Sequence, residues 1–419
     1  MEDLKARVCA VIDDLACEFI ETSHRIHETP ELMFKEFKSA KMLEALLAKH
    51  GMTVESGIAG MPTAFKAWAT TGARGTCGAP GTPSTRTCGT PGMPSTSAAP
   101  GPTIAILGEY DALPGVGHAC GHNIIGTSAA AAGIALVKAL GDVPATIAVF
   151  GCPAEEGGGG KIIMVREGWF KGVDAAMMTH PLPGESMIGG PNLATTSFVV
   201  KYYGKAAHAA ASPHDGINAL DAIMIAFTAI SYLRQQVTED VRMHGFVAQG
   251  GEASNIIPEY AEARYLVRAE KRATVDKIAE RVRRCFEAGA LATGARLEIT
   301  EGMQYSERVV NHTLAGLLRD NMRALGIQVK DEIEKVRGST DFGEVSQVVP
   351  AVNAYLSIAP ETVASHSHEM AEASKSPVGD KGLLDAAKAM AMTAVDLICD
   401  PALLRKAYDE FESTMIRKK

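Results

Sequence analysis

Hydrophobic positions along the chain follow two different spacings. Residues 2–22 and 36–50 carry apolar side chains three and four positions apart, a pattern that predicts two helices. Continuous apolar runs that begin near positions 103, 145 and 173 predict buried strands, and the small-residue segment 128–140 predicts a helix between the first two. Strands that alternate with helices are typical of an α/β domain with a mostly parallel sheet.

The stretch from 194 to 303 has its own order of elements. Its pattern predicts strand, helix, strand, strand, helix and strand (βαββαβ), the split-βαβ arrangement of a ferredoxin-like domain. Residues 304–419 return to mixed helix and strand. We therefore expect one α/β domain built from 1–193 and 304–419, with 194–303 inserted into it as a second domain.

Residues 70–102 differ from the rest of the chain in composition. They consist mainly of Gly, Pro, Ser, Thr and Ala. Such a segment buries too little apolar surface to offset its ordering entropy, so we expect a flexible surface insertion. A substrate lid is the alternative, because long irregular loops sometimes cover active sites.

Composition and charge narrow the class of protein. The 419 residues are 46% hydrophobic and 21% charged, with a net charge of -8, which argues against nucleic acid or an anionic membrane as a partner. The eight cysteines form no Cys-x-x-Cys pair, which favours a reduced, cytoplasmic protein over a disulfide scaffold. The N-terminal residues lack the pattern of a signal peptide, and no run of 18 apolar residues predicts a membrane span.

Metal-binding side chains gather where the predicted strands end. Ligands of α/β sheets bind at the carboxyl ends of strands, so residues that follow neighbouring strands are expected to converge. Thiolate, imidazole and carboxylate groups are the ligands that a divalent metal of borderline softness takes. The candidates are Asp111, His118, Cys120, His122, Glu155, Glu156, His180, His366 and His368.

The adjacent carboxylates of Glu155 and Glu156 can have two different roles. Adjacent carboxylates repel one another unless a cation or a proton lies between them. One carboxylate can bind a metal while its neighbour removes a proton from the water that the metal activates. The alternative is a solvated helix N-terminus, where the helix dipole favours acidic side chains.

Two other functions fit the same residues. Cys120 can act as a nucleophile with His118 or His122 as its base, although such a hydrolase does not need the further histidines and carboxylates. A non-catalytic metal-binding protein would use a closed site with four ligands. The spare carboxylate of the Glu155–Glu156 pair favours an open, catalytic site over that alternative.

The chain resembles the binuclear metal-dependent aminoacylase and carboxypeptidase family. It is most similar to the branch with auxin-conjugate hydrolases, aminobenzoyl-glutamate hydrolase and Xaa-Arg or β-alanyl-lysine dipeptidases. The matching motifs run in order from about residue 24 to residue 374. They are RIHETPEL, EYDALPGVGHACGHN, PAEEGGGG, THP, GKAAHAAASPHDGINALDA, SNIIPE and GSTDFGEVS.

The resemblance implies a role for each matching residue. It implies two divalent ions, zinc or manganese, held by Cys120, His122, Glu156, His180 and a last histidine, either His366 (favoured by spacing) or His368. Glu155 matches the general base. His208 matches a residue that reaches a neighbouring subunit's active site and binds the substrate or the oxyanion, and Asn255 matches a polar substrate-binding residue near it.

The implied protein is a metal-dependent amidohydrolase or dipeptidase. Its substrates would be N-acyl amino acids or dipeptide-like small molecules, and the inserted domain would serve as lid and dimerisation surface of a homodimer. Two features depart from the family pattern. The segment 70–102 is not part of it, and Asn123 stands where many members of the wider branch carry Asp.

Overall fold

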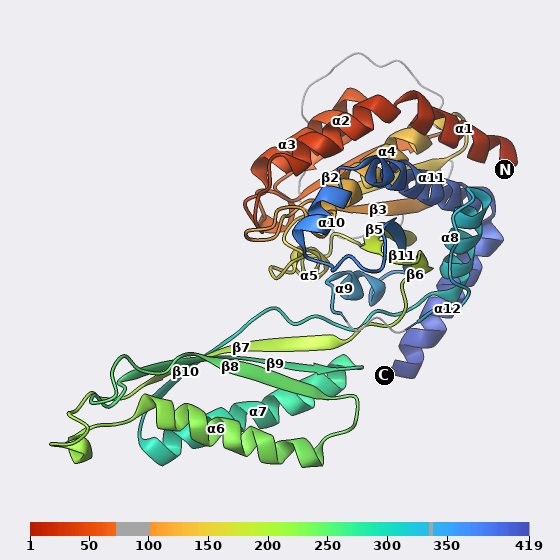
Figure 1. The fold of residues 1–419 in the computed structure, drawn as a ribbon. Helices are drawn as coiled ribbons and strands as arrows, with labels where there is room; N and C mark the ends of the chain where they lie inside the picture. Colours follow the sequence, from red (N-terminus) through yellow and green to blue (C-terminus); the bar gives the residue numbers. More distant parts are fainter. Residues whose placement is uncertain (73–100, 335–337, 419) are drawn as a thin grey trace, which may run out of the picture.

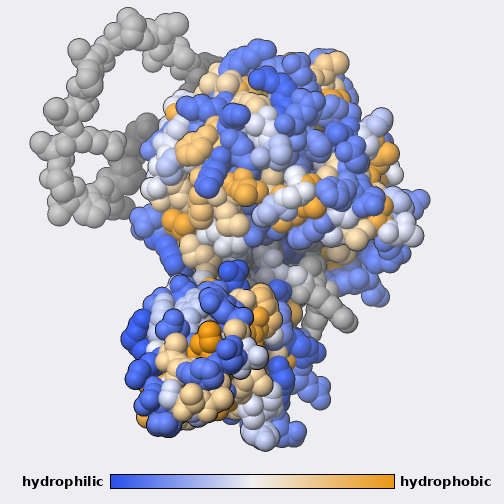
Figure 2. Space-filling model, turned by 60° about the vertical axis from the view of Figure 1, so that its left-hand side comes forward, coloured by the Kyte–Doolittle hydropathy of each residue, from blue (hydrophilic) through white to orange (hydrophobic). Residues whose placement is uncertain are grey.

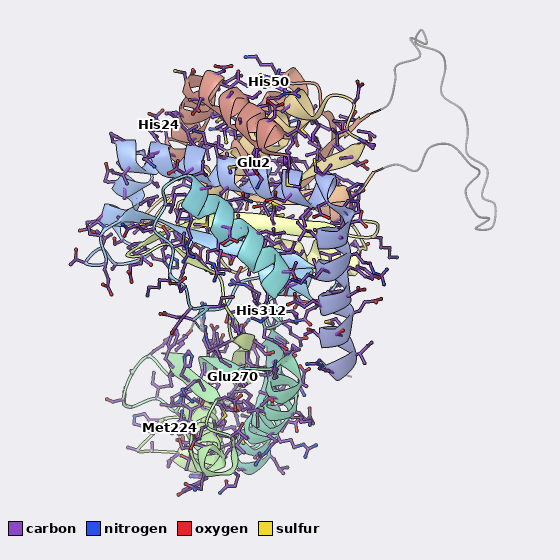
Figure 3. The ribbon with its side chains drawn as sticks, turned by 90° about the vertical axis from the view of Figure 1, so that its right-hand side faces the viewer. Glu2, His24, His50, Met224, Glu270 and His312 are labelled. Carbon is purple, nitrogen blue, oxygen red and sulfur yellow. The ribbon has the colours of Figure 1, made fainter. Side chains whose placement is uncertain are left out.

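The computed structural model describes residues 1–72, 101–334 and 338–418. It consists of two bodies joined by two neighbouring linkers (Figure 1). The larger body contains a seven-stranded sheet with strands from both ends of the chain, and we name it the catalytic domain after its expected role. The smaller body contains a four-stranded sheet formed by the middle of the chain, and we name it the lid for the same reason. Glu270 and His312 lie near the junction of the two bodies (Figure 3).

The sheet of the catalytic domain has the order β1-β2-β4-β3-β5-β11-β6. Its inner strands β4, β3, β5 and β11 pair in parallel, while the outer strands pair antiparallel. This confirms the predicted α/β class with a mostly parallel sheet. The strands are β1 (Thr53–Ser56), β2 (Phe65–Thr71), β3 (Thr103–Glu109), β4 (Ala145–Cys152), β5 (Ala175–Pro183), β6 (Met187–Ile188) and β11 (Ala351–Ala359).

Helices cover both faces of this sheet. The most buried is α4, which packs on β3 and β5 and between α1 and α11. Among the described residues, α4 is also the one helix that is long and apolar enough to cross a membrane. Of its most apolar stretch, 89% is buried inside the protein. The helices are α1 (Glu2–Asp14), α2 (Ala16–His27), α3 (Phe37–Lys49), α4 (His122–Leu140), α5 (Gly160–Arg166), α8 (His312–Ala324), α9 (Phe342–Ser346), α10 (His368–Ala373), α11 (Pro377–Cys399) and α12 (Pro401–Lys418).

The lid has the predicted βαββαβ order. Its sheet has the order β10-β7-β9-β8 and is antiparallel throughout. Buried and less buried residues alternate along β9, because helices cover only the face of the sheet that points away from the catalytic domain (Figure 1). The elements are β7 (Ala194–Tyr203), α6 (Ala219–Leu233), β8 (Arg242–Gln249), β9 (Tyr260–Ala269), α7 (Arg272–Thr293) and β10 (Arg296–Glu301).

Several predicted boundaries were wrong. The single helix expected over 2–22 is broken at Leu15, which separates α1 from α2. The helix expected to begin at 128 begins six residues earlier, so His122 is the first residue of α4. The insertion expected from position 70 begins later, because Thr70 and Thr71 pair with β4. The prediction of a flexible insertion otherwise falls on 73–100, outside the described residues.

Candidate functional site

The predicted metal-binding side chains meet at the carboxyl edge of the parallel sheet. Asp111 follows β3, Glu155 and Glu156 follow β4, and His180 lies on β5. Cys120 precedes α4, and His366 belongs to the loop between β11 and α10. This is the edge at which parallel sheets bind ligands, because the strand ends leave a crevice there.

Two groups of donor atoms share Cys120. One consists of Cys120, His122 and His180, and the other of Cys120, Glu156 and His366. Within each group the donor atoms lie within 4.8 Å of one another. The Cys120 Sγ lies 3.4 Å from His180 Nε2, and the Glu156 Oε1 lies 3.6 Å from His366 Nε2. A thiolate common to two groups is suited to bridge two ions, since paired metal ions in hydrolases lie about 3.5–4 Å apart.

Asp111 contacts two of these residues, His122 through its ring and Glu156 through its backbone. Its Oδ1 lies 2.9 Å from His122 Nδ1, and its Oδ2 accepts a hydrogen bond of 3.1 Å from the backbone N–H of Glu156. His180 is oriented in a similar way, with Nδ1 2.6 Å from the carbonyl oxygen of Pro181. Both rings therefore direct Nε2 into the site, as metal-ligating histidines do when a second group fixes the other nitrogen.

The donor atoms fit a divalent cation. Among the described residues, His122 Nε2 and Glu156 Oε1 are buried and have no hydrogen-bond partner, although buried polar atoms are nearly always paired. Burial lowers the pKa of His180 to about 4, so its ring is neutral near pH 7 and offers a lone pair. Burial opposes a charge on His122, but Asp111 raises its pKa well above the usual range and favours a cation at Nε2. Thiolate, imidazole and carboxylate together are a zinc-type donor set.

Glu155 lies beside the two groups without belonging to either. Its carboxylate lies within 4.8 Å of donor atoms of His122 and Glu156. Burial raises the pKa of Glu155 well above its usual range, and the nearby carboxylates of Glu109 and Asp341 raise it further. A carboxylate in such surroundings is suited to take up a proton.

The loop that carries Glu155 is held in a strained conformation. Ala154 has a φ of 59°, in the left-handed region that residues with a side chain rarely adopt. The backbone N–H of Ala154 donates a 3.0 Å hydrogen bond to Glu36 Oε1, and the Glu155 carbonyl oxygen accepts one of 3.2 Å from the hydroxyl of Tyr305. These contacts fix the backbone on both sides of the Glu155 side chain.

Three residues near this site were not recognised from the sequence. Lys161 is fully buried and contacts Glu109 and Asp341 at 2.5 and 2.6 Å. Burial lowers the pKa of Lys161, but Asp341 and Glu109 raise it well above the usual value, so the side chain is an ammonium. The sequence held a signal for two of them. Glu109 is an acidic residue at the end of the buried strand β3, and Asp341 lies inside the GSTDFGEVS motif.

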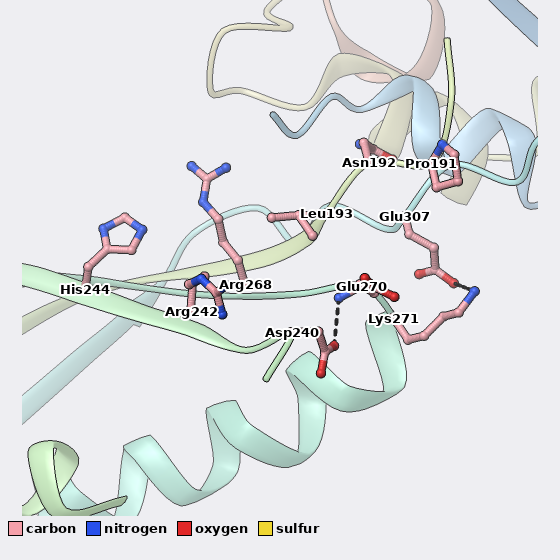
Figure 4. A pocket seen from close by; sticks show the side chains of 10 residues that line it. All are labelled: Pro191, Asn192, Leu193, Asp240, Arg242, His244, Arg268, Glu270, Lys271 and Glu307. Atoms are coloured by element: carbon pink, nitrogen blue, oxygen red, sulfur yellow. Dashed lines mark hydrogen bonds and ion pairs between the residues drawn. The ribbon is translucent and has the colours of Figure 1, made fainter. Parts of the chain in front are cut away.

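A fourth missed residue belongs to the lid. Arg268 of β9 is half-buried, and in the described part of the chain its guanidinium bonds only the Ser339 hydroxyl, at 3.2 Å. It lines a cavity of about 690 Å³ between the lid and the linkers (Figure 4). A second cavity of about 320 Å³ contains Cys120, Glu155 and His180. Asn192 lines both cavities.

Some predicted site residues lie outside the cluster. His208 and Asn255 are exposed neighbours in two lid loops, where the Ala209 N–H donates a 2.9 Å hydrogen bond to the Asn255 carbonyl oxygen. These loops lie at the end of the lid farthest from the linkers (Figure 1). His118 is buried with its ring centroid 6.0 Å from that of His27. His368 is exposed at the start of α10 and belongs to none of the donor groups formed by the described residues.

Comparison with known proteins identifies the family. The sequence model of peptidase family M20/M25/M40 matches residues 105–393. The chain belongs to this family. A mouse Xaa-Arg dipeptidase is 37% identical over 98% of this chain and 93% of its own length. A p-aminobenzoyl-glutamate hydrolase chain of Escherichia coli is 29% identical over 94% of this chain and 92% of its own length.

Two solved structures share the fold. An aminohydrolase of Staphylococcus aureus gives a TM-score of 0.72 at 20% identity and covers 94% of this chain and 100% of its own. A dinuclear metal-binding peptidase of Bacillus subtilis from the M20 family gives 0.66 at 21% identity and covers 92% and 99%. As a member of the M20 family, the protein is a metal-dependent hydrolase that acts on amide bonds.

Proposed function

We propose that the protein hydrolyses the amide bond between an acyl or aminoacyl group and an amino acid, with two divalent ions per subunit. The observation that carries this proposal is the pair of donor groups that share Cys120, with the Glu155 carboxylate beside them. Zinc is favoured by the thiolate and imidazole donors, and manganese by the carboxylate of Glu156. Bound divalent ions would polarise the scissile carbonyl and make a water molecule more acidic.

The proposal assigns each side chain of the cluster a role. Cys120, His122 and His180 would hold one ion, and Cys120, Glu156 and His366 would hold the other. Glu155 removes a proton from the attacking water and returns it to the leaving nitrogen, so one carboxylate serves both steps. Its burial and its place outside both donor groups support this role.

The two cavities suggest how a substrate lies. The smaller cavity, which the donor residues line, also contains apolar side chains such as Met178, Leu182 and Met187, which suit an uncharged acyl group. The larger cavity contains Arg268, a half-buried cation without a carboxylate partner in the described residues. We propose that Arg268 binds the carboxylate of the leaving amino acid, since arginine pairs with carboxylates through two parallel hydrogen bonds.

We further propose that the lid forms a homodimer. Strand β8 is an edge of the lid sheet, and an exposed edge strand is a ready template for pairing with a second chain. Large hydrophobic side chains are exposed on it and on α6, including Phe246 (59%), Met224 (55%) and Tyr232 (75%). Figure 2 shows hydrophobic side chains at the surface of the lid. Met224 lies at the end of the molecule opposite to His24 and His50 (Figure 3).

A dimer would give His208 a function. The described chain does not bring His208 into the cavity that contains Cys120, yet the residue is exposed on the lid. A second subunit would allow His208 to reach a neighbouring site and stabilise the oxyanion, with Asn255 beside it. We also propose a cytoplasmic location, because disulfides are rare there and the six described cysteines are unpaired (Cys9, Cys17, Cys120, Cys152, Cys285 and Cys399).

A substrate panel tests the proposed reaction. The purified protein, loaded with zinc or manganese, is incubated with N-acyl amino acids and dipeptides, each with a free or an amidated carboxyl terminus. We expect the protein to hydrolyse only the compounds with a free carboxyl terminus. Arg268→Gln should raise KM for these acids about tenfold or more with bound metal unchanged, because a charged hydrogen bond contributes about 1.5–3 kcal/mol. Equal cleavage of the amidated compounds would contradict the role of Arg268.

Mixing two inactive variants tests the shared site. His208→Ala and Glu155→Gln each remove one function, but one site of a mixed dimer contains both residues. After complete subunit exchange, about a quarter of all sites should regain activity, because half of the dimers are mixed. If exchange is demonstrated with labelled subunits and no activity returns, His208 does not act across the dimer.

A further inference from the structure

Lys161 contacts two members of a group of three carboxylates. One carboxylate oxygen from each of Glu109, Glu155 and Asp341 lies within 4.8 Å of the other two. The Lys161 Nζ lies 2.5 Å from Glu109 Oε1 and 2.6 Å from Asp341 Oδ1. The side chains of Lys161, Glu109 and Asp341 are fully buried, so water does not screen these charges.

The ammonium group is held by the backbone as well as by its own contacts. Lys161 is the second residue of α5, and its backbone N–H donates a 2.9 Å hydrogen bond to Asp341 Oδ2. Asp341 therefore holds Lys161 at two atoms, one oxygen for each. Glu109 closes the other side from the end of β3. The position of the Lys161 ammonium is consequently set by three elements that are far apart in sequence.

The same three carboxylates have the chemistry of a metal site. Oxygen ligands surround magnesium at about 2.0–2.1 Å and calcium at about 2.3–2.6 Å, so three oxygens within 4.8 Å of one another can share one ion. One of these carboxylates belongs to Glu155, the proposed base. An ion bound here would hold the carboxylate that has to accept a proton.

We propose that Lys161 takes the place of a third cation: its ammonium neutralises Glu109 and Asp341, excludes a divalent ion from this position, and so keeps Glu155 free. Lys161 is thus a positioning residue, because it acts through Glu155 rather than on the substrate. The inference rests on the proposed function, which assigns two ions to the groups around Cys120 and the role of base to Glu155.

Metal stoichiometry of the Lys161→Met variant tests this inference. Methionine fills a similar volume without a charge. Chelator-stripped protein is dialysed against increasing Mn²⁺, and bound metal is measured by mass spectrometry. The wild type should bind two ions per chain and the variant three. Turnover of the variant should also fall as Mn²⁺ is raised, while that of the wild type should not, because the third ion binds Glu155.

A double variant serves as the control. Glu109→Gln combined with Lys161→Met removes one of the three carboxylates, so binding should return to two ions. If Lys161→Met is poorly folded, Lys161→Gln carries the same prediction, since its amide is polar but uncharged. If a folded Lys161 variant and the wild type both bind two ions per chain, this inference is wrong while the proposed function stands. A wild type that does not bind two ions would instead contradict the proposed function.

Discussion

Cys120 Sγ lies 3.4 Å from the Nε2 of His180, although the two residues are 60 positions apart in the chain. The contact joins the loop before α4 to the strand β5. Burial raises the pKa of the Cys120 thiol to about 12. A thiol of this kind is a poor nucleophile near pH 7, because the thiolate is the reactive form. A bound metal would stabilise the thiolate, and coordination would then occupy it.

Thiol alkylation separates the metal hydrolase from a cysteine hydrolase. We expect iodoacetamide at about pH 7.5 to label the exposed Cys17 and to leave the turnover of the metal-loaded enzyme intact, because a metal on Cys120 would occupy its thiolate. Peptide mass spectrometry locates the label, and Cys17 serves as the internal control. Loss of turnover that follows a single label at Cys120 would instead support the cysteine as nucleophile.

Glu155→Gln tests the general base. The substitution keeps the size of the side chain but removes its ability to accept a proton. We expect kcat to fall by about 10²–10⁴, the usual contribution of a positioned base, with bound metal unchanged. Glu156→Gln is the matched variant, which should lose metal as well as turnover. An unchanged kcat for Glu155→Gln would remove this residue from the mechanism.

Much of the donor cluster could be predicted because its residues lie on or after the parallel strands. A parallel sheet brings the ends of β3, β4 and β5 to one edge, so sequence order was enough to place Asp111, Glu156 and His180 together. Lys161 could not be predicted in this way. A single lysine after four glycines usually faces solvent, and its burial depends on Asp341, 180 positions later.

The prediction of local structure failed where the hydrophobic pattern was weak or where a single glycine set the start of a helix. The strand β1 is short and mostly exposed, so it lacks the apolar run of a core strand. The start of α4 at His122 depends on Gly121, which has a φ of 73° and lets the chain turn directly into the helix. The apolar pattern alone marked only the later, alanine-rich part of α4.

Asn123, the departure from the wider branch, has a structural reason. Its amide nitrogen donates hydrogen bonds of 2.9 Å to Ser23 Oγ and 3.0 Å to the carbonyl oxygen of Ser374. An aspartate cannot donate and would carry a buried charge. We expect Asn123→Asp to lower the free energy of unfolding by about 2–4 kcal/mol. Denaturant unfolding measures this change, and Ser23→Ala should cost less; an unaltered stability would contradict the account.

Glu36 should make stability depend on pH. Burial raises its pKa from 4.5 to about 7, although its hydrogen bonds, including that from Thr63, oppose the shift. The folded state therefore keeps a proton on Glu36 that the unfolded state releases above about pH 4.5. The stability that this proton contributes is present at low pH and is lost as pH rises through about 7. We expect Glu36→Gln to flatten the fall of melting temperature between about pH 5 and 7. Parallel curves for both proteins would exclude this role of Glu36.

The central claim is that the protein hydrolyses amides with two ions, which the two donor groups that share Cys120 would hold. Its most direct test is a titration of the chelator-stripped protein with zinc or manganese, in which bound metal and hydrolysis of an N-acyl amino acid are measured in the same samples. We predict no turnover without metal and full turnover at two ions per chain, with Cys120→Ala unable to bind the pair. Full turnover of the metal-free protein, or two tightly bound ions in the Cys120→Ala variant, would contradict the claim.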